Sequence, residues 1–236
     1  MISHILSEKY NCFKCGNVGV PFISLIDKIG SRDYVVIELS SFQLELIDKF
    51  KPKISVILNL NPDHLNRYNS ELEYYKAKLN IFKNQNKKDY CILNFDDKNI
   101  RQIELNCLSK KLFFSLHNKN VNAFVRNDSI VTNIENRLKN YSLKLEDTHL
   151  FGKHNLANIL SAILVCQLCT MSTEEIIDRV KSFKAPPHRL ELVKISKGVK
   201  YVNDSKGTNI DATLNAINAF KGEKIHLLLG GSDKGE

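Results

Sequence analysis

The sequence predicts an α/β fold with a mostly parallel sheet, followed by a smaller second domain. Short apolar runs rich in β-branched residues alternate with stretches of helical periodicity, which is typical of βαβ units. Pro186 and Pro187 stop a helix and stiffen the chain, so they predict a boundary between residues 1–185 and 186–236. A chain of 236 residues is long enough for one large or two small domains with a buried core.

The expected strands coincide with the runs of β-branched residues. Before the proline pair they lie at residues 34–39, 54–60, 90–94 and 111–116. A hairpin is expected across residues 126–129. After the prolines we expect one βαβ unit, which has strands at 199–203 and 225–229.

The expected helices are marked by caps and by apolar spacing. Ser70 and Glu73 have the capping-box pattern and predict a helix that runs to about residue 83. Apolar residues recur at helical spacing from Asn155 onward, so a core helix is expected there. Two further helices are expected at 173–183 and 209–220.

The composition is that of an ordinary soluble globular protein. Hydrophobic residues make up 43% and charged residues 25%, which excludes disordered, collagen-like and coiled-coil classes. The longest apolar runs are too short to cross a bilayer, and the start of the chain does not have the pattern of a secretory leader. We therefore expect a cytoplasmic protein without a membrane partner.

The chain is basic, with 34 Lys and Arg against 26 Asp and Glu, a net charge of +8. Such an excess raises the possibility of nucleic-acid binding. The lysines are scattered, however, and do not form a stripe or a patch interleaved with aromatic residues. We do not expect a nucleic-acid partner.

The six cysteines include two C-x-x-C pairs, Cys12 with Cys15 and Cys166 with Cys169. Such pairs are compatible with a zinc site. The second pair lies within an apolar helical pattern, and the two pairs are far apart in the sequence. Buried thiols in a reducing cytoplasm are the favoured interpretation.

Polar residues follow four of the expected strands, where open parallel sheets bind their ligands. Glu38 and Ser40 follow the first of these strands, and His64 follows the second. Residues 203–208 follow the third and residues 230–235 the fourth. Each group could be a capped turn, but four together favour a site. A carboxylate buried at Glu38 would need a metal, a cation or hydrogen-bond donors.

Lys78 is notable for its position on the predicted helix. At 100° per residue it falls inside an apolar arc that includes Tyr74 and Phe82. Burial disfavours an ammonium group, so this lysine must reach solvent, pair with a carboxylate, or stay neutral and become reactive.

Glu38, His64 and Lys78 together suggest a divalent-metal site that handles phosphates, and the oxygen ligand favours Mg²⁺. The phosphate-binding motif G-x-x-x-x-G-K-[ST] is absent from the sequence. The residues by themselves therefore predict a two-domain α/β protein with a metal and phosphate site, and leave its reaction open.

Several segments, taken in order, resemble the central domain of the Mur ligases. They are ELSSFQLE (38–45), NLNPDHLNRY (59–68), YKAKLNIF (75–82) and GKHNLAN (152–158). PHRLE (187–191) and NDSKGTN (203–209) extend the resemblance into the third domain of that family. The last stretch is similar to that of the family members that add D-glutamate.

The resemblance implies an ATP-dependent amide ligase of peptidoglycan synthesis. Such an enzyme joins D-glutamate to UDP-N-acetylmuramoyl-L-alanine through an acyl phosphate, and its cofactors are ATP and Mg²⁺. The implied fold is the ATP-binding central domain followed by the first βαβ unit of a Rossmann-like C-terminal domain.

The resemblance also assigns roles to individual residues. Glu38 and His64 match magnesium ligands, and Lys78 matches a carbamylated lysine whose anionic form supports the metal site. His64 and Lys78 are the implied catalytic residues. The positions that match ATP contacts are Asn155, Asn158, Arg189 and Asp204. The positions that match substrate contacts are Asn17 and Ser40 for the UDP-sugar and Lys206, Thr208 and Lys234 for D-glutamate.

The same comparison leads us to expect an incomplete enzyme. The helix that follows the phosphate loop in the family corresponds to residues 2–10, so the loop and the UDP-binding domain are expected to be missing, together with most of the third domain. Positioning and charge neutralisation supply most of phosphoryl-transfer catalysis, so we expect this polypeptide alone to be weakly active or inactive. A separately encoded N-terminal piece could restore activity.

Two alternatives remain open. One is a non-catalytic nucleotide- or UDP-sugar-binding remnant or scaffold module that kept the fold. The other is a different activity within the Mur ligase family.

Overall fold

A computed structural model describes residues 1–62, 67–103 and 105–231. Within these residues the main sheet has six strands, in the order β3-β4-β5-β6-β7-β8. Neighbouring strands are parallel from β3 to β6 and antiparallel from β6 to β8. The strands are β3 (Ile54–Ile57), β4 (Tyr90–Asn94), β5 (Lys110–Ser115), β6 (Ala123–Arg126), β7 (Ser129–Ile134) and β8 (Arg137–Tyr141). The parallel part confirms the predicted sheet, and the predicted hairpin joins β6 to β7.

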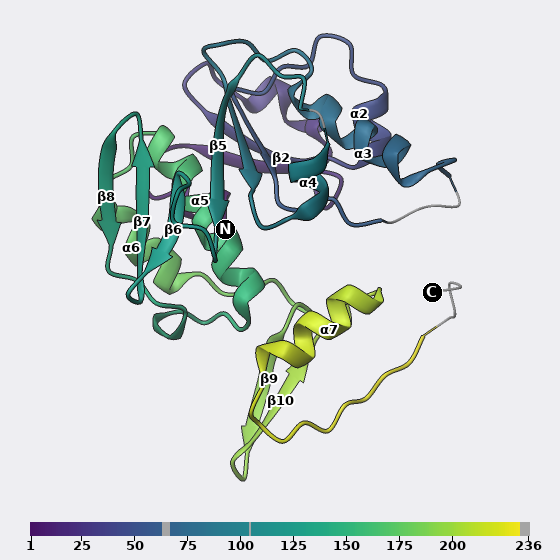
Figure 1. The fold of residues 1–236 in the computed structure, drawn as a ribbon, viewed down its shortest axis with the longest axis vertical. Coiled ribbons are helices and arrows are strands. Elements are labelled where there is room, and N and C mark those ends of the chain that lie inside the picture. Colours follow the sequence, from purple (N-terminus) through teal and green to yellow (C-terminus); the bar gives the residue numbers. More distant parts are fainter. Residues whose placement is uncertain (63–66, 104, 232–236) are drawn as a thin grey trace.

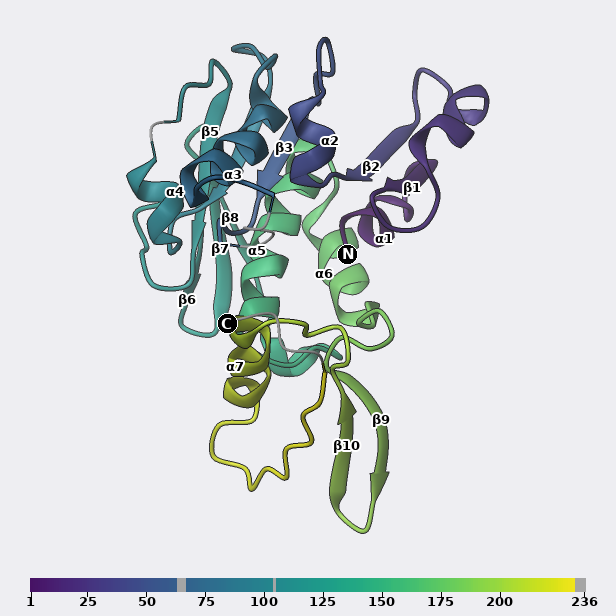
Figure 2. The ribbon, with the colours of Figure 1, turned by 90° about the vertical axis from the view of Figure 1, so that its right-hand side faces the viewer.

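Two smaller sheets flank the main one in the chain. Strands β1 (Cys12–Gly16) and β2 (Tyr34–Glu38) form a parallel pair near the N-terminus. Strands β9 (Glu191–Ser196) and β10 (Val199–Asn203) form an antiparallel hairpin after the proline pair. Figure 2 shows this hairpin and α7 (Ile210–Ala219) extending away from the rest of the molecule, which we call the body (residues 1–185).

Four helices of the body, α2 (Ser41–Glu45), α3 (Glu71–Leu79), α4 (Lys98–Gln102) and α6 (Thr173–Ser182), begin at a side-chain cap, whereas α1 (Ile2–Leu6) and α5 (Lys153–Leu168) do not. Ser70 accepts a hydrogen bond from the Glu73 amide and starts α3, which continues as a short 3₁₀ turn to Phe82. The Glu73 carboxylate accepts from the Asn69 amide, not from that of Ser70. The body also has 3₁₀ turns at Phe22–Lys28 and Leu145–Asp147.

The main core surrounds α5, which lies between the sheet and two other helices (Figure 1). Its side chains Ile159, Leu160 and Ile163 are completely buried. They pack against β4, β5 and β6 on one side and against α1 and α6 on the other. The predicted core helix is therefore confirmed. In the described part of the chain, every helix is too short or too polar to cross a membrane.

The cysteines are free thiols, and four of the six are buried. Cys15, Cys166 and Cys169 are buried and Cys12 is half-buried, in agreement with the favoured interpretation of the two pairs. Burial raises the pKa of Cys169 to about 11, so this thiol stays protonated at neutral pH. In the residues that the structure describes, no group of three or more His, Cys, Asp or Glu side chains could hold a metal ion.

The C-terminal part differs from the predicted βαβ unit in two ways. First, strand β9 was not predicted. It pairs antiparallel with β10, which therefore does not open a parallel βαβ unit. Second, the prediction of a strand at 225–229 is wrong. This segment is not paired with any described strand, and Leu228 is 96% exposed. An apolar run becomes a strand only where a neighbouring edge offers hydrogen bonds, and the described residues bring none to this segment. The helix expected at 2–10 is also shorter, ending at Leu6.

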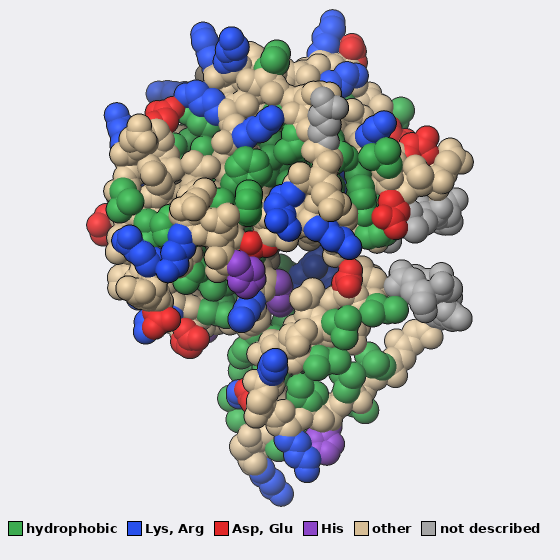
Figure 3. All heavy atoms as spheres, viewed as in Figure 1, with side chains coloured by type: hydrophobic (Ala, Val, Ile, Leu, Met, Phe, Trp, Pro, Cys, Tyr) green, Lys and Arg blue, Asp and Glu red, His purple; other side chains and the backbone are tan. Residues whose placement is uncertain are grey.

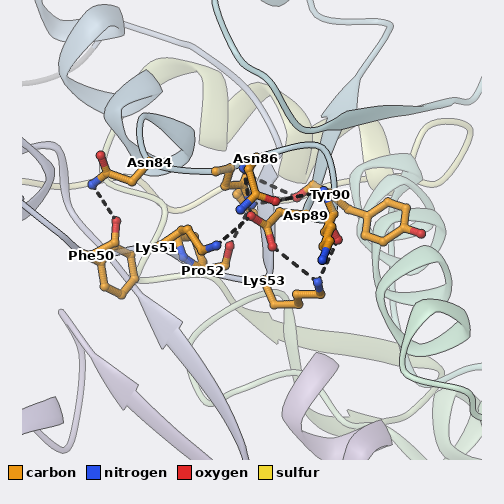
Figure 4. Close-up of polar contacts among 11 residues, drawn as sticks. Phe50, Lys51, Pro52, Lys53, Asn84, Asn86, Asp89 and Tyr90 are labelled. Atoms are coloured by element: carbon orange, nitrogen blue, oxygen red, sulfur yellow. Dashed lines mark hydrogen bonds and ion pairs between the residues drawn. The ribbon is translucent and has the colours of Figure 1, made fainter.

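A buried carboxylate joins two loops at the amino ends of β3 and β4 (Figure 4). The side chain of Asp89 is 2% exposed and lies 3.3 Å from the Lys51 amine and 3.4 Å from the Lys53 amine. It also accepts a 2.9 Å hydrogen bond from the Asn86 amide. Burial opposes ionisation of Asp89, but this hydrogen bond and the two lysines outweigh it and hold its pKa below the usual value.

We expect Asp89→Asn to lower the free energy of unfolding by about 2 kcal/mol at pH 7, because the charge that holds both lysines is lost. A lowered folded-state pKa stabilises the protein above the unfolded pKa of about 4, and this stabilisation disappears as pH falls through the folded value. Urea unfolding should therefore show the gap between wild type and variant closing below about pH 4. Asp128→Asn, which removes an exposed partner of Lys144, is the control and should cost less than about 0.5 kcal/mol. A gap that is the same at pH 7 and pH 2.5 contradicts this account of Asp89.

Candidate functional site

Asn17, Glu38 and Ser40 meet at the carboxyl edge of the β1–β2 sheet. Gly16 and Glu38 are register partners, and the Asn17 amide donates a 2.7 Å hydrogen bond to the Glu38 carbonyl. A Cβ at Gly16 would lie 2.1 Å from that carbonyl oxygen, and φ at Gly16 is +124°. Only glycine therefore allows the two strands to come this close at residue 16. Asn17 was predicted separately from Glu38 and Ser40, and the parallel register of β1 and β2 brings it to them.

The Glu38 side chain is exposed, which corrects the expectation of a deeply buried carboxylate. The expectation assumed a sheet covered on both faces, whereas β2 pairs only with β1 among the described strands. An exposed carboxylate of this kind fits Mg²⁺, which keeps several water ligands and binds through one or two protein oxygens.

Ser40 has a structural role that explains much of its position. Its hydroxyl accepts a hydrogen bond from the Gln43 amide at 3.3 Å, and its own amide donates to Gln43 Oε1 at 2.9 Å. This capping box starts α2 directly after the Glu38 strand. The polar Ser40 is therefore explained locally, and its contact with a UDP-sugar stays a prediction.

Lys78 is half-buried on α3, and its amine lies 4.7 Å from the centre of the Tyr74 ring. Tyr74 and Tyr75 on the same helix are buried, as is Phe82 just after it, so the predicted apolar arc is confirmed. The amine lies over an aromatic face, an arrangement that attracts a cation.

Two predicted site residues, His64 and Lys234, lie outside the described residues. Their predicted roles as metal ligand and D-glutamate contact are therefore not tested by the geometry. Of the three predicted metal-site residues, the structure describes Glu38 and Lys78.

The amino end of α5 brings together three of the predicted ATP contacts. Asn155 donates to the Phe151 carbonyl at 2.8 Å, and Asn158 donates to the Asn155 side chain at 3.3 Å. Burial lowers the pKa of His154, and the nearby Asp204 carboxylate partly opposes this shift. Asp204 follows β10, so this charge effect acts between α5 of the body and the C-terminal part. His154 was not predicted as a site residue, although it lies inside the GKHNLAN segment.

The remaining predicted residues lie at the base of the β9–β10 hairpin. Asp204 accepts a 2.9 Å hydrogen bond from the Leu190 amide, and the Lys206 amide donates to the His188 carbonyl at 3.1 Å. Arg189, Lys206 and Thr208 are exposed there. This end of the hairpin thus gathers cationic and hydroxyl groups next to α7.

A cleft separates α7 from the body (Figure 3). Basic (Lys or Arg), histidine and acidic side chains gather around the hollow in that view. The Asn61 side chain donates a 3.1 Å hydrogen bond to Asp211 on α7 and so bridges the cleft. A cavity of about 430 Å³ adjoins this bridge, lined by Asn61, Pro62, Glu71, Tyr75, Lys98, Asn99, Asp211 and Asn215.

We expect Asp211→Ala to loosen α7, because this substitution removes the hydrogen bond to Asn61. Amide hydrogen exchange in α7 should rise by about fivefold, the factor that corresponds to a net hydrogen bond of about 1 kcal/mol. Asn215→Ala, one turn further along α7 and lining the same cavity, is the matched control. Equal exchange in both variants would mean that the Asn61–Asp211 bond does not hold the helix.

Residues 1–166 match the family model described as the Mur ligase middle domain. The chain belongs to the Mur ligase family. A relative in Clostridioides difficile, named "UDP-N-acetylmuramoylalanine--D-glutamate ligase", is 41% identical over 237 residues, which cover 100% of this chain and 52% of that protein. A relative of the same name in Alkaliphilus metalliredigens is 42% identical and covers 95% of this chain and 49% of that protein.

Solved Mur ligases share the fold of this one. The MurF ligase from Thermotoga maritima, solved in complex with ADP, matches with a TM-score of 0.71 and 21% identity, over 93% of this chain and 52% of that one. A structure of MurF from Acinetobacter baumannii matches with a TM-score of 0.70 and 14% identity, over 94% of this chain and 51% of that one. This Mur ligase chain therefore spans about half the length of the curated relatives and solved structures that it matches.

Proposed function

We propose that this Mur ligase chain serves the ATP-dependent addition of D-glutamate to UDP-N-acetylmuramoyl-L-alanine in peptidoglycan synthesis. The observation that carries the proposal is the identity of about 40% to relatives named for that reaction, over nearly the whole chain. The NDSKGTN stretch at the base of the hairpin supports the choice of D-glutamate within the family.

Glu38 and His64 would hold Mg²⁺, which neutralises charge on the phosphate groups of ATP when bound. The exposed carboxylate of Glu38 supports this assignment, since it is an accessible oxygen ligand at a strand end. Lys78 is the residue that we propose to be carbamylated: its amine nitrogen bonds the carbon of CO₂ and releases a proton to solvent, leaving an anion. That anion supports the positive metal site.

The other residues bind and orient the substrates in this proposal. Asn155 and Asn158 on α5 face ATP together with Arg189 and Asp204 across the cleft. Asn17 and Ser40 lie beside the UDP-sugar, at the edge that also carries Glu38. Lys206, Thr208 and Lys234 bind D-glutamate, and the two ammonium groups neutralise its carboxylates. We place the domain boundary at residues 185 and 186, so that the ATP contacts come from both sides of it and the D-glutamate contacts from the C-terminal side.

The reduced cysteines agree with a location in the cytoplasm, where the nucleotide-linked substrate and ATP are both available. A separately encoded N-terminal piece is the partner that we propose for full activity.

Phosphate release from ATP tests the proposal. The purified chain is assayed with Mg²⁺, UDP-N-acetylmuramoyl-L-alanine and D-glutamate, alone and together with an N-terminal Mur ligase piece that carries a phosphate loop. The expected result is release that requires D-glutamate and is strongly increased by the added piece. L-glutamate, diaminopimelate and D-alanyl-D-alanine replace D-glutamate in parallel reactions. A preference for one of these, or ligand binding without turnover in both preparations, would overturn the proposed reaction.

A further inference from the structure

Three aromatic rings lie in series beside the Lys78 amine. We call Phe42, Tyr68 and Tyr74 the ring series. The Tyr74 ring lies 5.2 Å from that of Tyr68, and the Tyr68 ring is nearly parallel to that of Phe42, at 6.2 Å and 11°. The Lys78 amine lies over the Tyr74 face at one end of the series. Tyr68 and Tyr74 are buried, so water does not weaken the contacts between their rings.

The far end of the ring series is fixed by an ion pair. The Arg67 guanidinium lies 4.7 Å from the centre of the Phe42 ring and donates a 3.1 Å hydrogen bond to Glu45. The Tyr68 hydroxyl donates to the other oxygen of the same carboxylate. These hydrogen bonds, that of Tyr68 first and that of Arg67 second, lower the pKa of Glu45, which therefore stays charged at neutral pH. The Glu45 carboxylate thus fixes the positions of both Arg67 and the Tyr68 ring by hydrogen bonds.

This arrangement connects the two elements that carry the proposed metal site. Glu45 ends α2, which begins just after Glu38, and Lys78 lies near the end of α3. The two helices lie side by side in Figures 1 and 2, and the Asn80 side chain donates to the Leu44 carbonyl at 3.2 Å. The ring series therefore spans the space between α2 and α3.

We propose that Tyr74 is a positioning residue for the Lys78 amine, and that Phe42, Tyr68, Glu45 and Arg67 hold the Tyr74 ring in place. The inference rests on the proposed function, in which Lys78 supports the metal site. A flexible four-carbon side chain has many conformers, and before CO₂ adds, an aromatic face that attracts the protonated amine selects few of them. Core packing alone accounts for buried rings, but it does not require a cation at both ends of the series.

The test measures the position of Lys78 without relying on turnover. Protons on the carbon next to the amine shift upfield in NMR spectra when they lie over a ring face. The full chain is labelled at lysine, and Lys78→Arg assigns the signal. We expect Tyr74→Leu to abolish the upfield shift and Tyr74→Phe to keep it, because phenylalanine preserves the ring.

The far end is tested with a matched pair of variants. Arg67→Gln removes the guanidinium from Phe42 and from Glu45, and should reduce the upfield shift of Lys78 across the ring series. Arg101→Gln is the control, because Arg101 lies 5.6 Å from the Phe95 ring, outside the series. Arg67 is exposed, so the chain is expected to stay folded, and a thermal melt verifies this.

Phosphate release gives the functional readout in whichever preparation turns over. Tyr74→Leu should lower kcat about tenfold with little change in the KM for ATP, and Tyr74→Phe should restore it. An upfield shift that is unchanged in Tyr74→Leu, or unchanged in Arg67→Gln, overturns the inference. A wild-type chain that has the shift, but shows no D-glutamate-dependent turnover either alone or with the added N-terminal piece, leaves Tyr74 in its positioning role and refutes the proposed function instead.

Discussion

Lys78→Arg is expected to abolish carbamylation while leaving the fold unchanged. Arginine keeps a cation over the Tyr74 ring, since guanidinium stacks on aromatic faces, but it is always protonated and cannot react with CO₂. Incubation with ¹³C-bicarbonate should give a carbamate carbonyl signal in the wild-type chain and none in the variant. In the preparation that contains the added N-terminal piece, phosphate release should fall about 10²- to 10³-fold, the size of effect seen when one charge-stabilising group is removed from an active site.

The control for this substitution is Lys76→Arg, two residues earlier on the exposed face of α3. It makes the same chemical change, but at a residue that belongs neither to the proposed site nor to the ring series, and should leave both the carbamate signal and phosphate release unchanged. A carbamate signal that persists in Lys78→Arg would assign the modification to another amine. Full phosphate release in that variant would remove Lys78 from the proposed chemistry.

Ile163→Ala is expected to have the largest effect on stability. Ile163 is completely buried in the middle of α5, between the sheet and the helices α1 and α6. Removing its side chain loses apolar burial and leaves a cavity, which together lower the free energy of unfolding by about 3 to 5 kcal/mol. Urea unfolding followed by circular dichroism measures this loss as a lower midpoint at an unchanged slope.

Leu138→Ala on β8 is the matched control, because its side chain is 60% exposed. Leu138→Ala should lower the free energy of unfolding by less than about 0.5 kcal/mol, because folding of the chain buries little of the apolar surface of Leu138. Equal losses in the two variants would show that α5 is not the centre of the core.

The helices and strands that were predicted correctly depend on local signals. The Ser70 cap, the apolar spacing after Asn155 and the β-branched run at 34–38 each act within a few residues. The segment at 225–229 has an equally strong local signal, but the strand predicted there does not form. A strand needs a neighbouring strand to pair with, and no described strand lies beside this segment.

The candidate site could be predicted only in its residue types. Strand-end position indicated Glu38, and the helical period indicated Lys78, but neither observation gives exposure or contacts. Glu38 is open to solvent because β2 pairs with β1 alone among the described strands. His154 and Asp211 were missed because their partners, Asp204 and Asn61, are distant in the sequence.

The sequence by itself determined the α/β class, the caps, the core helix and the chemistry available at the strand ends, because each of these follows from residue type and spacing. Only the tertiary structure decided that a carboxylate would clamp two lysines at Asp89, that Tyr74 would lie under the Lys78 amine, and that Asn61 would reach Asp211 across the cleft. The physical reason is that charge pairing and ring contacts act over a few ångströms in space, and the fold alone decides which distant residues come that close.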